Sequence, residues 1–205
     1  MKKLLITISA TAVLFVACNQ TEQKHSENHL TEMKHDSTKN VMMQAMDESM
    51  VAMHQAKMTG NADYDFASMM IPHHEGAIVM AEAVIKNGKS SSLINFSKKV
   101  IIVQKKEISL LKEFLKTANQ HPSKDASAFK KALDASMGPM MEGMDKVKLT
   151  NNVDKDFVVL MIPHHQSAVD MAKAYLPYSA NNNIRAIAEQ ILAAQKEEIN
   201  WLKTQ

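Results

Sequence analysis

Residues 70–81 read MIPHHEGAIVMA, and residues 161–172 read MIPHHQSAVDMA, 91 positions further along the chain. Extended to 61–81 and 152–172, the two segments are identical at 12 of 21 positions without a gap. The same offset relates QKKEISLL (104–111) to QKEEINWL (195–202). Matches that share one offset indicate an internal repeat.

Each repeat is predicted to contain three helices, because its apolar residues recur at helical spacing. The expected ranges are 40–58, 63–87 and 91–117 in the first repeat, and 125–147, 154–176 and 182–203 in the second. Residues 118–124 link the repeats, and His121-Pro122 breaks the periodic pattern there. Gly138-Pro139 leaves open whether 125–147 is one helix or two. Asn61 or Asp63, and Asn152 or Asp154, are expected to cap the second helix of each repeat.

The composition favours an all-α fold. Of the 205 residues, 45% are apolar and 22% are charged, which is typical of a folded chain. Only 5 Gly and 5 Pro, with 5% aromatic residues, argue against a turn-rich β-sandwich. We therefore predict a four-helix core with pseudo-two-fold symmetry from 63–117 and 154–203, against which the two Met-rich helices pack. The repeats, 40–117 and 125–205, would together form one domain.

Two histidine pairs and two glutamates are the main candidates for chemistry. On the helix over 63–87, the position of His73 lies opposite the charged face, and His74 lies on the flank. His164 and His165 take the same positions in the second repeat. Glu107 and Glu198 each lie within an apolar stripe, with Gln104 and Gln195 beside them. A carboxylate in such a stripe is costly unless it is paired, so we expect Glu107 to pair with His73 and Glu198 with His164.

These residues allow two interpretations. The Glu–His pairs could simply join helices through buried polar contacts. Imidazoles and carboxylates on facing helices of a bundle are also a known way to bind a transition metal, which is the interpretation that we favour for His73, His74, His164, His165, Glu107 and Glu198.

Methionine is unusually frequent, with 17 residues in the chain. The expected helices over 40–58 and 125–147 carry two equivalent stripes, namely Met46, Met50 and Met53, and Met137, Met141 and Met144. Such stripes are often core, because methionine fills gaps well. Leucine would pack as well, however, so the choice of sulfur suggests soft Cu(I) ligands. Met70, Met80, Met161 and Met171, on the buried faces of the histidine helices, complete the candidate ligands.

The N-terminus predicts export. Lys2 and Lys3 precede an apolar run from residue 4 to residue 16, which is too short to span a bilayer and is typical of a signal peptide. The run ends in FVAC at Cys18, the only cysteine, which resembles a bacterial lipobox. We therefore expect a signal peptide over 1–17, lipidation of Cys18 and a polar tether over 18–39. A secreted protein with a stray thiol is the alternative.

The paired MIPHH-x-x-A-x-x-M segments, each followed by Q-x-x-E-I, resemble the bacterial secreted domain-of-unknown-function family numbered 305. The resemblance covers roughly 61–115 and 152–205. It implies a ferritin-like fold, identifies the four histidines as the family's HH residues, and matches Glu107 and Glu198 to its later acidic position. Some members, the CopM-type periplasmic proteins, bind copper. The two copies differ at Gly76 and Ser167, which predicts half-sites of different affinity.

These features favour a membrane-anchored lipoprotein on the periplasmic or cell-surface side that sequesters or passes on copper. Its partners would be the metal ion, in the Cu(I) or Cu(II) state or as another transition metal, the membrane, and a metal-exchange protein. The charge is balanced, with 24 basic and 22 acidic residues, and no basic run suggests nucleic acid.

Three other functions stay open. One is a metal-dependent ferritin-like enzyme, although the folded region lacks the paired E-x-x-H of di-iron bundles. The second is a metal-free structural or interaction module. The third, non-covalent haem ligated by Met and His, is a minor one because C-x-x-C-H is absent.

Overall fold

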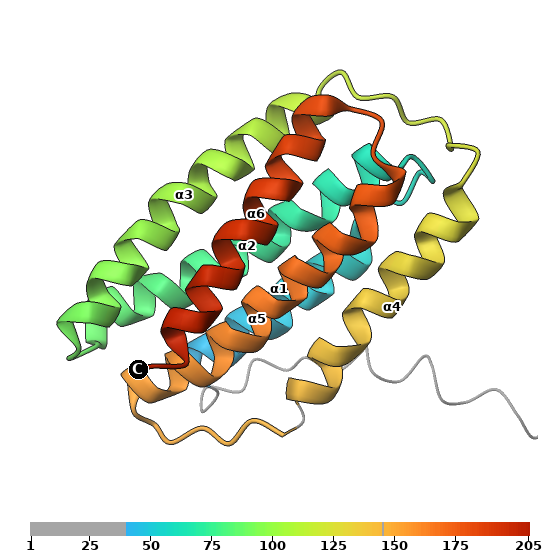
Figure 1. The fold of residues 1–205 in the computed structure, drawn as a ribbon. Helices are drawn as coiled ribbons and strands as arrows, with labels where there is room; N and C mark the ends of the chain where they lie inside the picture. The colour runs from blue at the N-terminus through green and yellow to red at the C-terminus, as the bar shows by residue number, and fades with distance from the viewer. Residues whose placement is uncertain (1–39, 145) are drawn as a thin grey trace, which may run out of the picture. The chain divides into compact units, whose positions relative to one another are not determined.

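The computed structural model describes residues 40–144 and 146–205, all of which belong to one compact unit, residues 38–205. The predicted signal peptide, Cys18 and the tether lie outside the described residues. Six α-helices follow one another: α1 (Val41–Gln55), α2 (Ala62–Asn87), α3 (Ser91–Leu115), α4 (Ala126–Met144), α5 (Val153–Tyr175) and α6 (Asn182–Leu202), with a short 3₁₀ turn, η1 (Leu176–Tyr178), after α5 (Figure 1). The described residues form no strand, which confirms the all-α prediction.

The helices with the histidine pairs, α2 and α5, lie at the centre of the bundle (Figure 1). They pack against each other; α3 and α1 cover α2, and α6 and α4 cover α5. This position requires a helix that is apolar on several sides, and 17 of the 26 residues of α2 are indeed buried, against 7 of 25 in α3. The predicted four-helix core with two further helices against it is therefore present.

Local sequence explains where the helices begin and continue. Asn61 and Asn152, and not the neighbouring aspartates, cap α2 and α5 by accepting backbone hydrogen bonds from Tyr64 and Lys155. Helix α4 continues through Gly138-Pro139 as a single helix to Met144. In the described residues, no helix combines the length and the hydropathy that crossing a bilayer requires.

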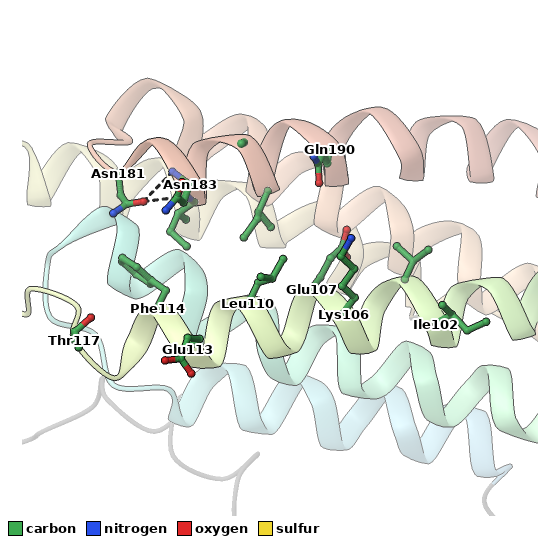
Figure 2. A pocket seen from close by; sticks show the side chains of 14 residues that line it. Ile102, Lys106, Glu107, Leu110, Glu113, Phe114, Thr117, Asn181, Asn183 and Gln190 are labelled. Atoms are coloured by element: carbon green, nitrogen blue, oxygen red, sulfur yellow. Dashed lines mark hydrogen bonds between the residues drawn. The ribbon is translucent and has the colours of Figure 1, made fainter.

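Helices α3 and α6 run antiparallel and leave two hollows between them. The larger, which we call the large groove, has a volume of about 970 Å³ and lies between the C-terminal half of α3 and the N-terminal half of α6 (Figure 2). Figure 2 shows Leu110 and Phe114 rising from α3 towards α6. The smaller, the small groove, has a volume of about 360 Å³ and lies at the opposite end, where Phe96 and Lys99 of α3 and Glu198 and Trp201 of α6 line it.

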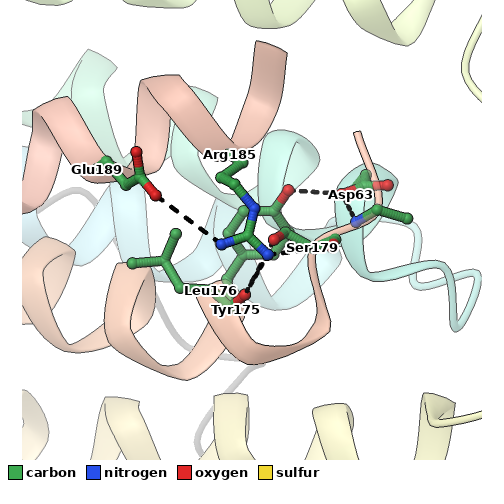
Figure 3. Close-up of polar contacts among 7 residues, drawn as sticks. Asp63, Tyr175, Leu176, Ser179, Arg185 and Glu189 are labelled. Carbon is green, nitrogen blue, oxygen red and sulfur yellow. Dashed lines mark hydrogen bonds and ion pairs between the residues drawn. The ribbon is translucent and has the colours of Figure 1, made fainter. Parts of the chain in front are cut away.

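Two aspartates tie the repeats together. Asp63, at the start of α2, accepts hydrogen bonds from the Tyr175 hydroxyl at 2.5 Å and from the backbone N–H groups of Ala180 and Asn181, just before α6 (Figure 3). Asp154, at the equivalent position of α5, accepts backbone hydrogen bonds from the turn just before α3. Burial, and then the hydrogen bond to Asp63, raise the pKa of Tyr175 well above its ordinary value, so this phenol stays neutral. Each repeat thus fixes the start of the other repeat's last helix.

Candidate metal centre

All four histidines of the repeated motif are fully buried, with 0% exposure. Neighbouring residues on a helix point about 100° apart, so the two members of each pair face different neighbours. His73 of α2 and His164 of α5 meet where the central helices pack, with ring centroids 3.9 Å apart. His74 and His165 point instead towards the outer helices α3 and α6.

The two glutamates pair with the second histidine of each motif. An oxygen of Glu107 lies 2.9 Å from Nε2 of His74, and an oxygen of Glu198 lies 3.0 Å from Nε2 of His165. The prediction that His73 and His164 are the partners is therefore wrong. Neither oxygen lies along the ring N–H direction. Each carboxylate is therefore within ion-pair distance of its histidine but forms no directed hydrogen bond with it.

The four rings form a buried row across the bundle. Ring centroids are 6.0 Å apart for His73 and His74, and 6.2 Å apart for His164 and His165, on either side of the central 3.9 Å contact. Glu107 ends the row on α3 and Glu198 ends it on α6. The sequence repeat thus becomes a pseudo-symmetric line of six side chains that runs from one outer helix to the other.

The central imidazoles are neutral at physiological pH. Burial, followed by the neighbouring imidazoles, lowers the pKa of both His73 and His164 well below the ordinary value of 6.5. A neutral imidazole has one ring nitrogen with a free lone pair, which is the form that binds a metal.

Most ring nitrogens lack a protein partner. Besides the two carboxylate contacts, Nε2 of His73 lies 3.1 Å from the Ser167 hydroxyl. The other five nitrogens, Nδ1 of all four histidines and Nε2 of His164, make no hydrogen bond of good geometry within the described structure, and the only further polar contribution to the two central rings comes from each other's backbone. Buried polar atoms are normally paired, so an unpaired set of this size is an unusual feature that suits a ligand with which they could bond.

The two halves of the row are not identical. Ser167 contacts His73, whereas the equivalent residue for His164 is Gly76, which has no side chain. A Cβ at position 76 would lie 2.7 Å from Cβ of Ser49, because α1 packs closely on α2 there. The contact between α1 and α2 therefore excludes a serine and leaves His164 without a partner. The motif comparison gave the Gly76–Ser167 difference, but not this contact.

Two amides accompany the row. Gln104 and Gln195 are 2% and 3% exposed, and their Oε1 atoms have no hydrogen-bond partner in the structure as described. Each lies one helical turn before the glutamate of its helix. The sequence placed them beside the glutamates, but nothing in it showed that their Oε1 atoms would be unpaired.

The candidate methionines belong to the core to different degrees. Buried are Met46, Met53, Met70, Met80, Met161 and Met171; half-buried are Met50, Met137 and Met144; and Met141 is 47% exposed. Met46 and Met53 belong to two different apolar clusters, and Met50 packs against both. Helix α1 packs chiefly on α2 and helix α4 on α5, yet both apolar clusters contain members of both stripes: Met137 packs against the cluster of Met53, and Met144 packs against the cluster of Met46.

No group of three or more His, Cys, Asp or Glu side chains within residues 40–144 and 146–205 is arranged to hold a metal ion. The donor set nevertheless suits a transition metal. It offers imidazoles with unpaired nitrogens, of which the two central ones are neutral, and one carboxylate beside each histidine pair. A bound ion would draw on the His74–Glu107 or the His165–Glu198 pair, together with further donors.

Known structures resemble the fold. Six chains of solved structures match, and no curated protein matches. The structure described as CopM in the apo form is 27% identical, with a TM-score of 0.54, and the match covers 69% of this chain and 93% of that one. CopM in the Cu(II)-bound form matches with the same values. CopM in the Cu(I)-bound form is 26% identical over the same shares, with a TM-score of 0.52.

A family profile extends over most of the sequence. The profile described as "Domain of unknown function (DUF305)" matches twice, at residues 12–115 and 63–205, and the second match includes both histidine motifs. The first match ends close to the end of the first repeat, whereas the second extends over the histidine helices of both repeats. By sequence and by fold, the chain belongs to the DUF305 family.

Proposed function

We propose that this protein binds copper outside the cytoplasm and holds it or passes it on. The observation that carries the proposal is the set of five unpaired ring nitrogens in the buried histidine row. The structures of CopM, with Cu(I), Cu(II) and Ag bound, support copper as the ion because that protein shares the fold at 26–27% identity.

The two oxidation states would use different ligands. The imidazoles and carboxylates of the row, from His73, His74, His164, His165, Glu107 and Glu198, are borderline to hard donors and suit Cu(II). The thioethers are soft and uncharged and suit Cu(I), so we assign Met46, Met50, Met53, Met137, Met141 and Met144 to it. Met70, Met80, Met161 and Met171 are further candidate sulfur donors on the central helices.

The chain's own residues would contribute in three ways. The apolar surroundings of the row exclude water and keep the two central imidazoles neutral, so no proton has to leave His73 or His164 before an ion binds. Glu107 and Glu198 supply negative charge that partly neutralises a cation in a buried place. The central packing of α2 against α5 holds the rings of both repeats together.

A copper titration tests this function. The purified protein, stripped of metal, is expected to bind Cu(II) stoichiometrically at pH 7 and to give a visible or electron paramagnetic resonance spectrum with nitrogen ligation. Cu(I) is expected to bind in the presence of a reductant, measured by competition with a chromogenic chelator. The His54→Gln, His121→Gln control changes only exposed histidines and is expected to bind both ions as the wild type does. Wild-type protein that binds neither ion would contradict the proposal.

We also propose that Cys18 carries a lipid that anchors the protein to the membrane. Support comes from the sequence alone: the short apolar run, the FVAC ending and the polar residues that follow. A Cys18→Ser variant is expected to move from the membrane fraction to the soluble fraction, because a covalent lipid supplies the anchoring energy. If the variant is processed normally and remains with the membranes, Cys18 is not the anchor.

A further inference from the structure

The buried histidine row has contact with solvent only near its two ends. All four imidazoles are 0% exposed, whereas the side chain of Glu107 is 10% exposed and that of Glu198 is 25% exposed. Each carboxylate therefore lies between solvent and the histidine that it contacts. An ion that reaches the imidazoles from solvent by the shortest path passes one of these carboxylates.

Each carboxylate opens into its own groove. Glu107 lines the large groove (Figure 2), and Glu198 lines the small groove, at the other end of α3 and α6. The pseudo-two-fold symmetry thus gives two separate access routes to one buried row. A hollow that ends at a carboxylate attracts cations, because the surrounding protein screens the charge less than water does.

We infer that Glu107 and Glu198 are the two points through which copper is loaded, each from its own groove, and that the Glu198 route is the faster. This inference rests on the proposed copper-binding function and adds the path of the ion to it. Glu198 is the more exposed of the two. Each groove is lined by one further glutamate and one lysine, Glu197 and Lys99 in the small groove and Glu113 and Lys106 in the large one, so exposure of the carboxylate and not the charge of the groove distinguishes the two routes.

The chain contains a natural reporter for one of the routes. Trp201 is the only tryptophan, and it lines the small groove together with Glu198. It stacks on Phe96 with ring centroids 4.7 Å apart, and Phe96 in turn lies 6.4 Å from the His165 ring. Because Cu(II) quenches nearby indole fluorescence, quenching of Trp201 reports loading at the Glu198 end.

The experiment mixes the full-length metal-free protein with limiting Cu(II) in a stopped-flow instrument and follows Trp201 fluorescence. Glu198→Gln, which keeps the side-chain shape, is expected to slow the association rate about tenfold. Glu198→Asp keeps the carboxylate and is expected to restore most of the rate. Glu107→Gln is expected to leave the change in Trp201 fluorescence as it is in the wild type. It should slow only the copper uptake through the large groove, which is measured by absorbance.

Each variant has a matched control in the same groove. Glu197→Gln removes a charge beside Glu198, and Glu113→Gln removes one from the large groove, but neither residue contacts a histidine. Both are expected to change the association rates less than twofold. If Glu197→Gln slowed the association of Cu(II) as much as Glu198→Gln does, the total charge of the groove and not Glu198 itself would set the rate. That result would overturn the inference.

The association rate separates a loading point from a mere ligand. If Glu198 only held the bound ion, Glu198→Gln would raise the dissociation rate and leave the association rate unchanged, which would also overturn the inference. Wild-type protein that binds Cu(II) tightly, with association rates unaffected by either Glu→Gln change, would refute the two routes and leave the proposed function standing. Wild-type protein that binds no Cu(II) would refute both.

Discussion

The metal-free protein is expected to lose unfolding free energy between pH 7 and pH 5, up to a limit of about 4 kcal/mol that is reached when neither His73 nor His164 takes up a proton in the folded state. The cause is the burial of His73 and His164, which holds the pKa of both rings well below 6.5 in the folded state. In the unfolded chain these rings take up protons as the pH falls through about 6.5. The unfolded state then binds more protons than the folded state, so the stability is full above this pH and is lost as the solution is acidified.

Urea unfolding at several pH values, in the presence of a chelator, measures this loss. His73→Leu combined with His164→Leu is expected to flatten the profile, because the two titrating groups are gone and the replacements are apolar. His54→Gln with His121→Gln changes two exposed histidines and is expected to keep the wild-type slope. An unfolding free energy that is equal at pH 7 and pH 5 would show that the central rings take up protons in the folded state.

The fold was predictable because the repeat and the helical periodicity agree with each other. Each helix is present near its predicted range, and Asn61 and Asn152 each occupy one of the two cap positions that the sequence allowed. The functions of Asp63 and Asp154 were not predictable in the same way. Their partners lie in the other repeat, and a one-dimensional pattern contains no information on such distant contacts.

The prediction assigned the wrong histidine to each glutamate, and this error has a physical cause. Assigning one inward face to α2 assumes a helix that packs on one side, whereas α2 packs on α1, α3 and α5. The side of His73 faces α5, and the flank that carries His74 faces α3 and its Glu107. One signal could have corrected this: residues 62–87 include only five charged side chains, which is typical of a helix surrounded by others.

The remaining features of the site depend on close packing. That His164 lacks a hydroxyl partner follows from Gly76, and Gly76 is required by the approach of Ser49 from α1. The unpaired Oε1 atoms of Gln104 and Gln195 likewise depend on distances between helices. Periodicity predicts which face of a helix is buried, but it does not predict whether a polar atom on that face finds a partner.

Replacing the six stripe methionines with leucine is expected to lower the affinity for Cu(I) by on the order of 100-fold while the protein still folds. Leucine has nearly the same volume and helix propensity, and Met-to-Leu exchanges usually cost less than about 1.5 kcal/mol each. The buried residues Met46 and Met53 will carry most of the cost, whereas the exposed Met141 will carry little. Circular dichroism and urea unfolding measure the folding, and competition with a chromogenic chelator measures Cu(I).

The result shows whether the stripe methionines serve only to pack the core or also bind Cu(I). Their burial alone does not distinguish these two functions. Met69→Leu is the matched control, because the second repeat already has a buried leucine, Leu160, at the equivalent position. This control is expected to bind Cu(I) as the wild type does. Binding of Cu(II) is expected to survive in the six-leucine variant, since the histidine row is unchanged. If that variant instead binds Cu(I) as tightly as the wild type, the stripes serve only the core, and Cu(I) must be held by other donors, of which Met70, Met80, Met161 and Met171 on the central helices are the next to test.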